Sequence, residues 1–204
     1  PLLAHRVTDL FEAVQPLQLV ANGPTSCTVT KINHEKGYWL TAAHCVHNYW
    51  EDEFGGIQQT AKERLFIAGE PAYLHATVSI HPGGDMAILF SPTAKAKRAL
   101  KMSVHPPVEG DLVRMVGFPA GIGPFLTEGR VGSHYMFFRE YDEWLLAFDM
   151  TVCGGNSGSA IVNSKDEVIS VMTRYYVPLP PCTPHSAGTP YWTFRAFAGI
   201  YFGK

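Results

Sequence analysis

The sequence predicts an all-β domain built from short antiparallel strands joined by turns. Among its 204 residues are 19 glycines and 15 prolines, which punctuate the chain at short intervals. Hydrophobic residues make up 46% of the chain, enough for a sizeable core, but they come in runs of strand length. All-β proteins of two barrels often reach this length undivided, so we expect one compact domain with two subdomains.

The first part of the chain begins with a predicted helix and continues with strands. Residues 7–14 place apolar side chains at helical spacing behind Thr8 or Asp9, and Pro16 would end the helix. Three β-like segments follow it along the chain. They are residues 17–20, 27–32 and 38–41.

The second part of the chain repeats this pattern of short apolar segments. We expect strands at 112–119, 126–131 and 168–174, and a last strand at 191–197 that completes the fold. The basic run 95–101 lies between the two parts, and such runs are usually solvated linkers. Nucleic-acid binding is the weaker alternative for this run, because no aromatic residues interleave with its charges to stack on bases.

The charge balance gives no reason to expect a charged partner. Sixteen basic and eighteen acidic residues leave a formal charge of −2, so neither nucleic acid nor an anionic membrane is favoured. No apolar run is long enough to span a bilayer. The chain opens at Pro1 without a basic and apolar signal sequence, so we expect a processed product or a trimmed chain.

A glycine-rich stretch around Ser157, residues 151–162, is the strongest local indication of chemistry. Closely spaced glycines let backbone N–H groups point at a ligand instead of at a strand partner. The N–H groups of Gly155 and Ser157 would then stabilise the oxyanion that forms in acyl transfer, with Ser157 as the nucleophile. The alternative is a plain glycine-rich turn, and only a base elsewhere in the chain can decide between them.

Three segments together resemble the chymotrypsin-like serine proteases. They are Thr41-Ala42-Ala43-His44-Cys45, Asp85 directly before the apolar segment 86–90, and Gly155-Asn156-Ser157-Gly158-Ser159. Their order along the chain, His then Asp then Ser, is the order of that family and not of the α/β-hydrolases or subtilisins. The resemblance covers about residues 17–175 and is nearest in pattern to the bacterial glutamyl-endopeptidase-like, HtrA-like and viral branches.

The resemblance implies a fold and a division of roles. It implies two packed six-stranded Greek-key β-barrels, about 17–95 and 105–197, within one peptidase domain of residues 1–204. His44 would act as the base, Asp85 would orient its imidazole, and Ser157 would attack the peptide bond to form an acyl-enzyme. Asp85 also has an alternative role as a residue that caps a turn, and we interpret the other eight histidines as surface or core side chains.

The same resemblance implies two disulfides and an oxidising compartment. Cys27 would pair with Cys45, and Cys153 with Cys182, as in secreted or periplasmic members. A zinc site from Cys27, His44, Cys45 and His47 is the disfavoured alternative, because adjacent ligands fit tetrahedral geometry poorly. We therefore expect no metal and no cofactor.

Two departures from the animal digestive enzymes bear on activation and specificity. Asn156 stands where those enzymes have an aspartate that pairs with a newly cleaved amine, so we expect activity without zymogen cleavage. Specificity should depend on residues that surround the site: Thr151, Val152, Met172, Thr173 and Arg174. Met172 replaces the histidine of glutamate-specific relatives, so we expect an uncharged residue before the scissile bond, unless Arg174 reaches the pocket and reverses the preference.

The sequence therefore predicts a secreted or periplasmic serine endopeptidase that acts on peptides or proteins. We expect a monomer, with neither nucleic acid nor a membrane as a partner. A viral protease that processes a polyprotein is the first alternative, although paired disulfides are less expected there. The second alternative is a binding module that kept the fold and lost catalysis, which the presence of His44, Asp85 and Ser157 disfavours.

Overall fold

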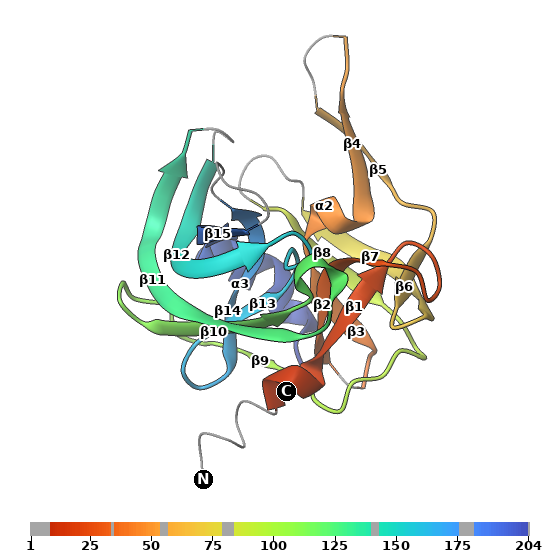
Figure 1. Cartoon of the computed structure of the whole chain (residues 1–204), viewed down its shortest axis with the longest axis horizontal. Helices are drawn as coiled ribbons and strands as arrows, with labels where there is room; N and C mark the ends of the chain where they lie inside the picture. The colour runs from red at the N-terminus through yellow and green to blue at the C-terminus, as the bar shows by residue number, and fades with distance from the viewer. Residues whose placement is uncertain are drawn as a thin grey trace.

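Strands dominate the structure, a computed structural model that describes residues 9–33, 35–53, 57–78, 84–139, 143–175 and 182–203 (Figure 1). The elements of the first half are β1 (Val14–Gln18), β2 (Thr25–Asn33), β3 (Tyr38–Thr41), α2 (Ala43–Val46), β4 (His47–Glu51), β5 (Ile57–Ala61), β6 (Leu65–Ile67), β7 (Glu70–Val78) and β8 (Met86–Phe90). The elements of the second half are β9 (Lys101–Met102), β10 (Leu112–Gly117), η1 (Pro119–Gly121), β11 (Phe125–Phe138), β12 (Glu143–Cys153), β13 (Ala160–Val162), β14 (Glu167–Tyr175), β15 (Cys182–Gly188), α3 (Tyr191–Ala198) and η2 (Gly199–Tyr201).

Six strands of the first half close into an antiparallel barrel in the order β1-β2-β3-β8-β7-β6. Side chains alternate between the two faces of a strand, and β2 uses both faces. Cys27 and Val29 lie in the core of this barrel. Thr28 and Thr30, which alternate with them, hydrogen-bond to backbone groups of the second half of the chain. β2 is therefore the strand along which the two halves meet.

Six strands of the second half form another antiparallel ring in the order β10-β11-β12-β15-β14-β13. The pairing of β13 with both β10 and β14 closes this ring. The short strand β9 adds to the outside of β14 in parallel. The prediction of two six-stranded antiparallel barrels is confirmed.

The short helices agree only partly with the sequence-based expectation. Residues 9–13 are helical and residue 14 already begins β1, while the first residues of the expected helix lie outside the described part of the chain. The expected strand at 191–197 is wrong, because α3 occupies that segment. Tyr191, Phe194 and Ala198 are its buried residues, and this spacing is helical rather than alternating. The strand that completes the second barrel is β15.

Two segments outside the barrels contact the first half of the chain. In the linker between the barrels, Lys97 Nζ lies 3.2 Å from Glu12 Oε1, and Arg98 Nε lies 3.2 Å from Asp9 Oδ1. Beyond α3 the chain returns to the first barrel, where the N–H of Gly203 donates to the carbonyl oxygen of Ile32 at 3.0 Å.

The hairpin of β4 and β5 projects away from both barrels (Figure 1). It begins directly after α2, and its Trp50 is half exposed. Within the described ranges, no helix is long and apolar enough to cross a membrane.

Candidate active site

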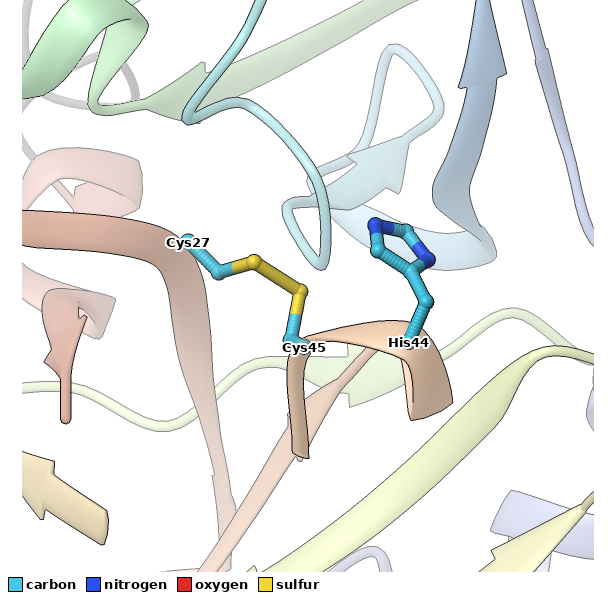
Figure 2. A group of neighbouring side chains, drawn as sticks. All are labelled: Cys27, His44 and Cys45. Atoms are coloured by element: carbon cyan, nitrogen blue, oxygen red, sulfur yellow. A yellow bond between two sulfur atoms is a disulfide. The ribbon is translucent and has the colours of Figure 1, made fainter. Parts of the chain in front are cut away.

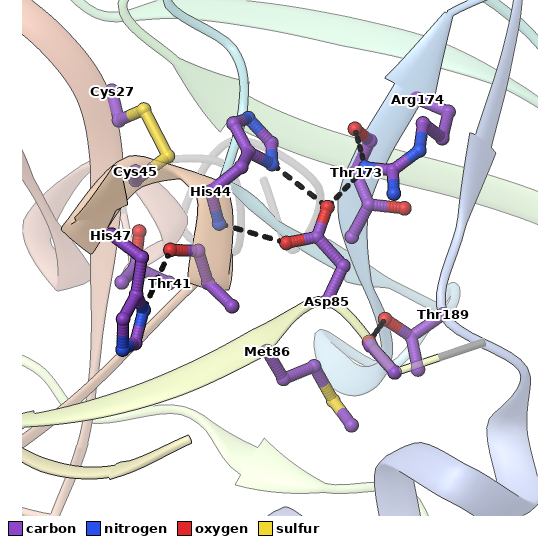
Figure 3. Close-up of polar contacts among 12 residues, drawn as sticks. Cys27, Thr41, His44, Cys45, His47, Asp85, Met86, Thr173, Arg174 and Thr189 are labelled. Atoms are coloured by element: carbon purple, nitrogen blue, oxygen red, sulfur yellow. Dashed lines mark hydrogen bonds and ion pairs between the residues drawn. A yellow bond between two sulfur atoms is a disulfide. The ribbon is translucent and has the colours of Figure 1, made fainter. Parts of the chain in front are cut away.

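His44 and Asp85 lie together because their strands are neighbours in the first barrel. His44 follows the end of β3, Asp85 precedes β8, and Thr41 of β3 pairs with Ala87 of β8. The backbone N–H of His44 donates to Asp85 Oδ1 at 2.9 Å, and His44 Nδ1 lies 2.8 Å from Asp85 Oδ2 (Figure 3). An ionised carboxylate can only accept, so Nδ1 carries the proton and Nε2 remains as the basic nitrogen.

Asp85 is held in an environment that keeps its carboxylate charged. Only 2% of the residue is exposed. Burial alone would raise its pKa, but the hydrogen bonds from His44 and the nearby positive charges outweigh burial and hold the pKa below its usual range. The backbone at Asp85 has a φ of 38°, a left-handed conformation that is unfavourable for a residue other than glycine. Thr189 Oγ1 donates to the carbonyl oxygen of the preceding Gly84 at 2.8 Å and fixes the entry to β8.

The loop that carries Ser157 is fastened to the first barrel by Thr28. The N–H of Thr28 donates to the carbonyl oxygen of Ser157 at 2.8 Å, and Thr28 Oγ1 donates to the carbonyl oxygen of Gly155 at 2.9 Å. Thr41 Oγ1 in turn donates to the carbonyl oxygen of Thr28 at 2.8 Å. This chain of hydrogen bonds links the Ser157 loop to the end of β3, three residues before His44. Sequence reasoning missed both threonines, although a polar side chain inside an apolar strand was a signal for them.

Two glycines let the Ser157 loop approach its neighbours closely. Gly155 has a φ of 97° and Gly158 a φ of 84°. A Cβ at Gly155 would lie 2.2 Å from the carbonyl oxygen of Phe118, and one at Gly158 would lie 2.2 Å from Thr41 Oγ1. Only glycine fits these two positions without a shift of the backbone.

The N–H groups of Gly155 and Ser157 donate to no backbone acceptor among the residues that the structure describes. The N–H groups next to them are engaged: Asn156 donates to Cys153 at 3.1 Å and Gly158 to Met172 at 2.8 Å. Two donors in the loop therefore have no described backbone acceptor, and their role as an oxyanion hole stays a prediction. The Ser157 side chain is partly exposed and makes no hydrogen bond to any described residue, so its pairing with His44 stays a prediction.

A family model of the trypsin-like peptidase domain matches residues 25–171. The chain belongs to this family. The predicted resemblance to the chymotrypsin-like proteases, including their HtrA-like branch, is therefore confirmed.

Curated relatives of this peptidase domain are DegP-type proteins. The periplasmic serine endoprotease DegP of Escherichia coli strain K12 is 28% identical over 151 residues, which cover 72% of this chain and 29% of the relative. A probable periplasmic DegP-like serine endoprotease of Buchnera aphidicola subsp. Baizongia pistaciae is 31% identical over 155 residues, covering 72% of this chain and 30% of the relative. This chain thus spans less than a third of these relatives.

Solved structures share the fold. The MamO protease domain from Magnetospirillum magneticum superposes with a TM-score of 0.69 at 18% identity, covering 97% of this chain and 100% of that one. An inactive form of Rv3671c from Mycobacterium tuberculosis superposes with a TM-score of 0.67 at 15% identity, covering 95% and 88% of the two chains. The predicted chymotrypsin-like fold is confirmed.

Both predicted disulfides of the peptidase domain are confirmed: Cys27 with Cys45 and Cys153 with Cys182. The first disulfide joins β2 to α2 directly beside His44 (Figure 2). The donor atoms of Cys27, Cys45 and His44 lie within 4.8 Å of one another, close enough to hold a metal ion. The two sulfurs are bonded to each other, however, and a disulfide provides no thiolate ligand. His47 is also engaged, since its Nδ1 lies 3.2 Å from the carbonyl oxygen of Ala43.

The predicted specificity residues fall into two groups. Thr151 is exposed, whereas Val152, Met172 and Thr173 are buried. Met172 braces the Ser157 loop through its backbone, because its N–H donates to the carbonyl oxygen of Ser159 at 2.9 Å and its own carbonyl oxygen accepts from Gly158. The role of these residues in substrate binding stays a prediction, and residues 176–181 lie outside the described part of the chain.

Arg174 has contacts that the sequence did not predict. Its Nη1 forms an ion pair with Asp85 Oδ2 (Figure 3). Its Nη2 lies 3.7 Å from Glu143 Oε2. The guanidinium therefore contacts the carboxylate that binds His44. Glu143, at the start of β12, had no predicted role.

Proposed function

We propose that this chain is a serine endopeptidase that hydrolyses peptide bonds through an acyl-enzyme. The observation that carries the proposal is the pair of hydrogen bonds from His44 to the buried, ionised Asp85. This pair leaves Nε2 of His44 free to act as a base. The Ser157 loop, fastened by Thr28 to the same end of the first barrel, supplies the nucleophile.

In the proposed reaction, His44 Nε2 takes the proton of the Ser157 hydroxyl while Oγ attacks the carbonyl carbon of the substrate. The N–H groups of Gly155 and Ser157 donate to the carbonyl oxygen as it becomes negative. The imidazolium, stabilised by Asp85, then returns the proton to the leaving amine, which departs. Water attacks the resulting ester in the same way and releases Ser157.

Activity without zymogen cleavage is part of the proposal. Asn156 is buried, its N–H donates to Cys153 at 3.1 Å, and its carbonyl oxygen accepts from the N–H of Ser159 at 3.0 Å. The loop is thus ordered by its own hydrogen bonds, which supports a site that needs no newly cleaved amine. A chain of this sequence that is inert until clipped would contradict this part.

We further propose a secreted or periplasmic monomer that acts on peptides or proteins, with no nucleic acid or membrane partner. The two disulfides and the periplasmic relatives support an oxidising compartment. An uncharged residue before the scissile bond remains the proposed preference, because Arg174 is occupied by two carboxylates. We also propose one peptidase domain with two subdomains near the expected bounds, 17–95 and 105–197, although the first barrel itself begins with β1 at Val14 and the second ends with β15 at Gly188.

Labelling with a fluorophosphonate, read by intact mass, tests the reaction directly. We expect one added probe per chain, no added probe in Ser157→Ala, and no free thiol before reduction. A folded protein that takes up no probe would refute the proposal and favour a binding module with this fold. Free thiols in a freshly prepared sample would refute the oxidising compartment.

A further inference from the structure

Arg174 is a buried cation that the second barrel directs at the first. It lies near the end of β14, and only 9% of its side chain is exposed. Its Nη1 contacts Asp85 Oδ2 and also donates to the carbonyl oxygen of Thr173 at 3.1 Å. Nη2 lies 3.7 Å from Glu143 Oε2, whose side chain is 1% exposed. The guanidinium thus contacts two buried carboxylates, of which Figure 3 shows Asp85.

Arg174 and His44 contact the same oxygen of Asp85. His44 Nδ1 lies 2.8 Å from Oδ2, so the fixed guanidinium and the imidazole face each other across one carboxylate oxygen. Among the residues that the structure describes, the charged and titratable groups beside Asp85 or Arg174 come from four elements. His44 belongs to α2, Arg174 to β14 and Glu143 to β12, while Tyr49 of β4 has its pKa raised by burial and by the charge of Asp85.

We propose that Arg174 is a positioning residue for the proposed peptidase reaction, acting through Asp85. It holds the carboxylate in place against His44, and its fixed positive charge opposes protonation of the imidazole. The proposal rests on the proposed function, because it assigns Arg174 a role in the same site. It differs from the sequence-based expectation, which placed Arg174 among the residues that bind substrate.

The positive charge of Arg174 has a definite sign of effect. A protonated imidazole is stabilised by Asp85 and by Glu143 but repelled by Arg174. Removing the cation takes away this repulsion, so the imidazole of the variant should keep its proton up to a higher pH than that of the wild type. Because a protonated imidazole cannot act as a base, the reaction of Ser157 would begin at a higher pH.

The test is the pH dependence of the fluorophosphonate labelling rate in matched variants. In Arg174→Gln we expect the acidic limb of the profile to move up by about one pH unit. The rate on the plateau should fall about ten-fold, because the carboxylate loses a group that orients it. Arg174→Lys keeps the charge but not the planar fork, so its limb should stay near that of the wild type. Glu143→Gln removes an anion, so its limb should move to lower pH.

Arg114→Gln is the matched control. Arg114 is also a buried arginine of the second barrel, paired with Asp166 at 2.6 Å, but it lies in β10 and contacts neither His44 nor Asp85. We expect this variant to lose stability while its labelling profile keeps the same limb. A loss of stability alone therefore does not imitate the predicted shift.

A second measurement separates this proposal from the proposed function. The proton on His44 Nδ1, hydrogen-bonded to Asp85, should give a proton NMR signal far downfield of the amide region. Its titration in Ser157→Ala protein, with and without Arg174→Gln, needs no activity. If the wild type does not label, but the midpoint of the His44 titration still moves up in Arg174→Gln, the proposed peptidase activity is refuted. The influence of Arg174 on the pair of Asp85 and His44 is then still supported. The role of Arg174 would be overturned if neither Arg174→Gln nor Glu143→Gln moved the midpoint of the His44 titration or the acidic limb of the labelling profile. If Arg174→Gln fails to fold, the result for Glu143→Gln decides alone.

Discussion

Replacing Gly155 with alanine would put a methyl group where the structure has no room for one. The new Cβ would lie 2.2 Å from the carbonyl oxygen of Phe118 and 3.2 Å from the N–H nitrogen of Ala120. Both obstacles are backbone atoms, which cannot rotate away as a flexible side chain can. The φ of 97° adds a conformational cost of about 1–3 kcal/mol for any residue with a Cβ. The peptide at residue 155 must therefore shift.

This shift would remove one of the two N–H donors proposed for the oxyanion. Loss of a single donor typically lowers kcat by about 10²–10³, which corresponds to about 2.7–4 kcal/mol of transition-state stabilisation. We expect a loss of this size in Gly155→Ala, measured as the rate of fluorophosphonate labelling and as kcat/KM on a peptide found by library screening. Circular dichroism on the same samples would show whether the fold is kept.

The adjacent glycine provides the control. Gly154 is exposed, and an added Cβ would meet no atom within 4 Å, so Gly154→Ala should react at nearly the wild-type rate. Wild-type reactivity in Gly155→Ala would show that its N–H is not an oxyanion donor. An equal loss in both variants would show that the steric reasoning fails.

Three further predictions concern stability. Replacing Cys153 and Cys182 by serine removes a disulfide between residues that are 29 positions apart. The unfolded chain then gains conformational entropy, so the free energy of unfolding in denaturant should fall by about 3–4 kcal/mol. A fall of less than about 1 kcal/mol would contradict this entropy argument. The lowered pKa of Asp85 stabilises the fold at pH values above its ordinary pKa of 3.8 and this contribution is lost as pH falls through the folded value. The stability difference between wild type and Asp85→Asn should therefore shrink from about pH 5 towards about pH 2, and a constant difference would argue against the charge effect. Tyr49→Phe removes a buried hydroxyl that has no partner among the described residues, so it should change stability by less than about 0.5 kcal/mol, and a larger loss in thermal unfolding would reveal a hidden hydrogen bond.

Local motifs predicted the parts of the site that depend on short stretches of chain. Each proposed catalytic residue lies next to a strand that could be recognised in the sequence. His44 follows β3, Asp85 directly precedes β8, and Ser157 lies shortly before β13. The resemblance then implied the two disulfides, which the structure confirms. Apart from the segment 191–197, each predicted strand begins within about three residues of an observed one, because period-two alternation is a local signal. Strands with weaker alternation, such as β4 to β7 and β12, were not predicted.

Contacts between distant segments could not be predicted from the sequence. Arg174 and Asp85 are 89 residues apart, and their ion pair depends on how one barrel docks against the other. β15 contains a proline and a glycine, so its local propensity for strand is low, and it forms because β12 and β14 supply partners on both sides. The aromatic residues of α3 favour strand by propensity, and burial at helical spacing overrides that preference.

The return of the chain from α3 to the first barrel has a consequence for the time at which the site forms during synthesis. A ribosome makes His44 and Asp85 first, then Ser157 and Arg174, and only afterwards β15, which closes the second ring, and Gly203, which hydrogen-bonds back to Ile32. The emerging first barrel carries a base without a nucleophile. A nascent chain therefore carries only half of the proposed site, and cleavage of neighbouring polypeptides has to wait until the second barrel has folded onto the first.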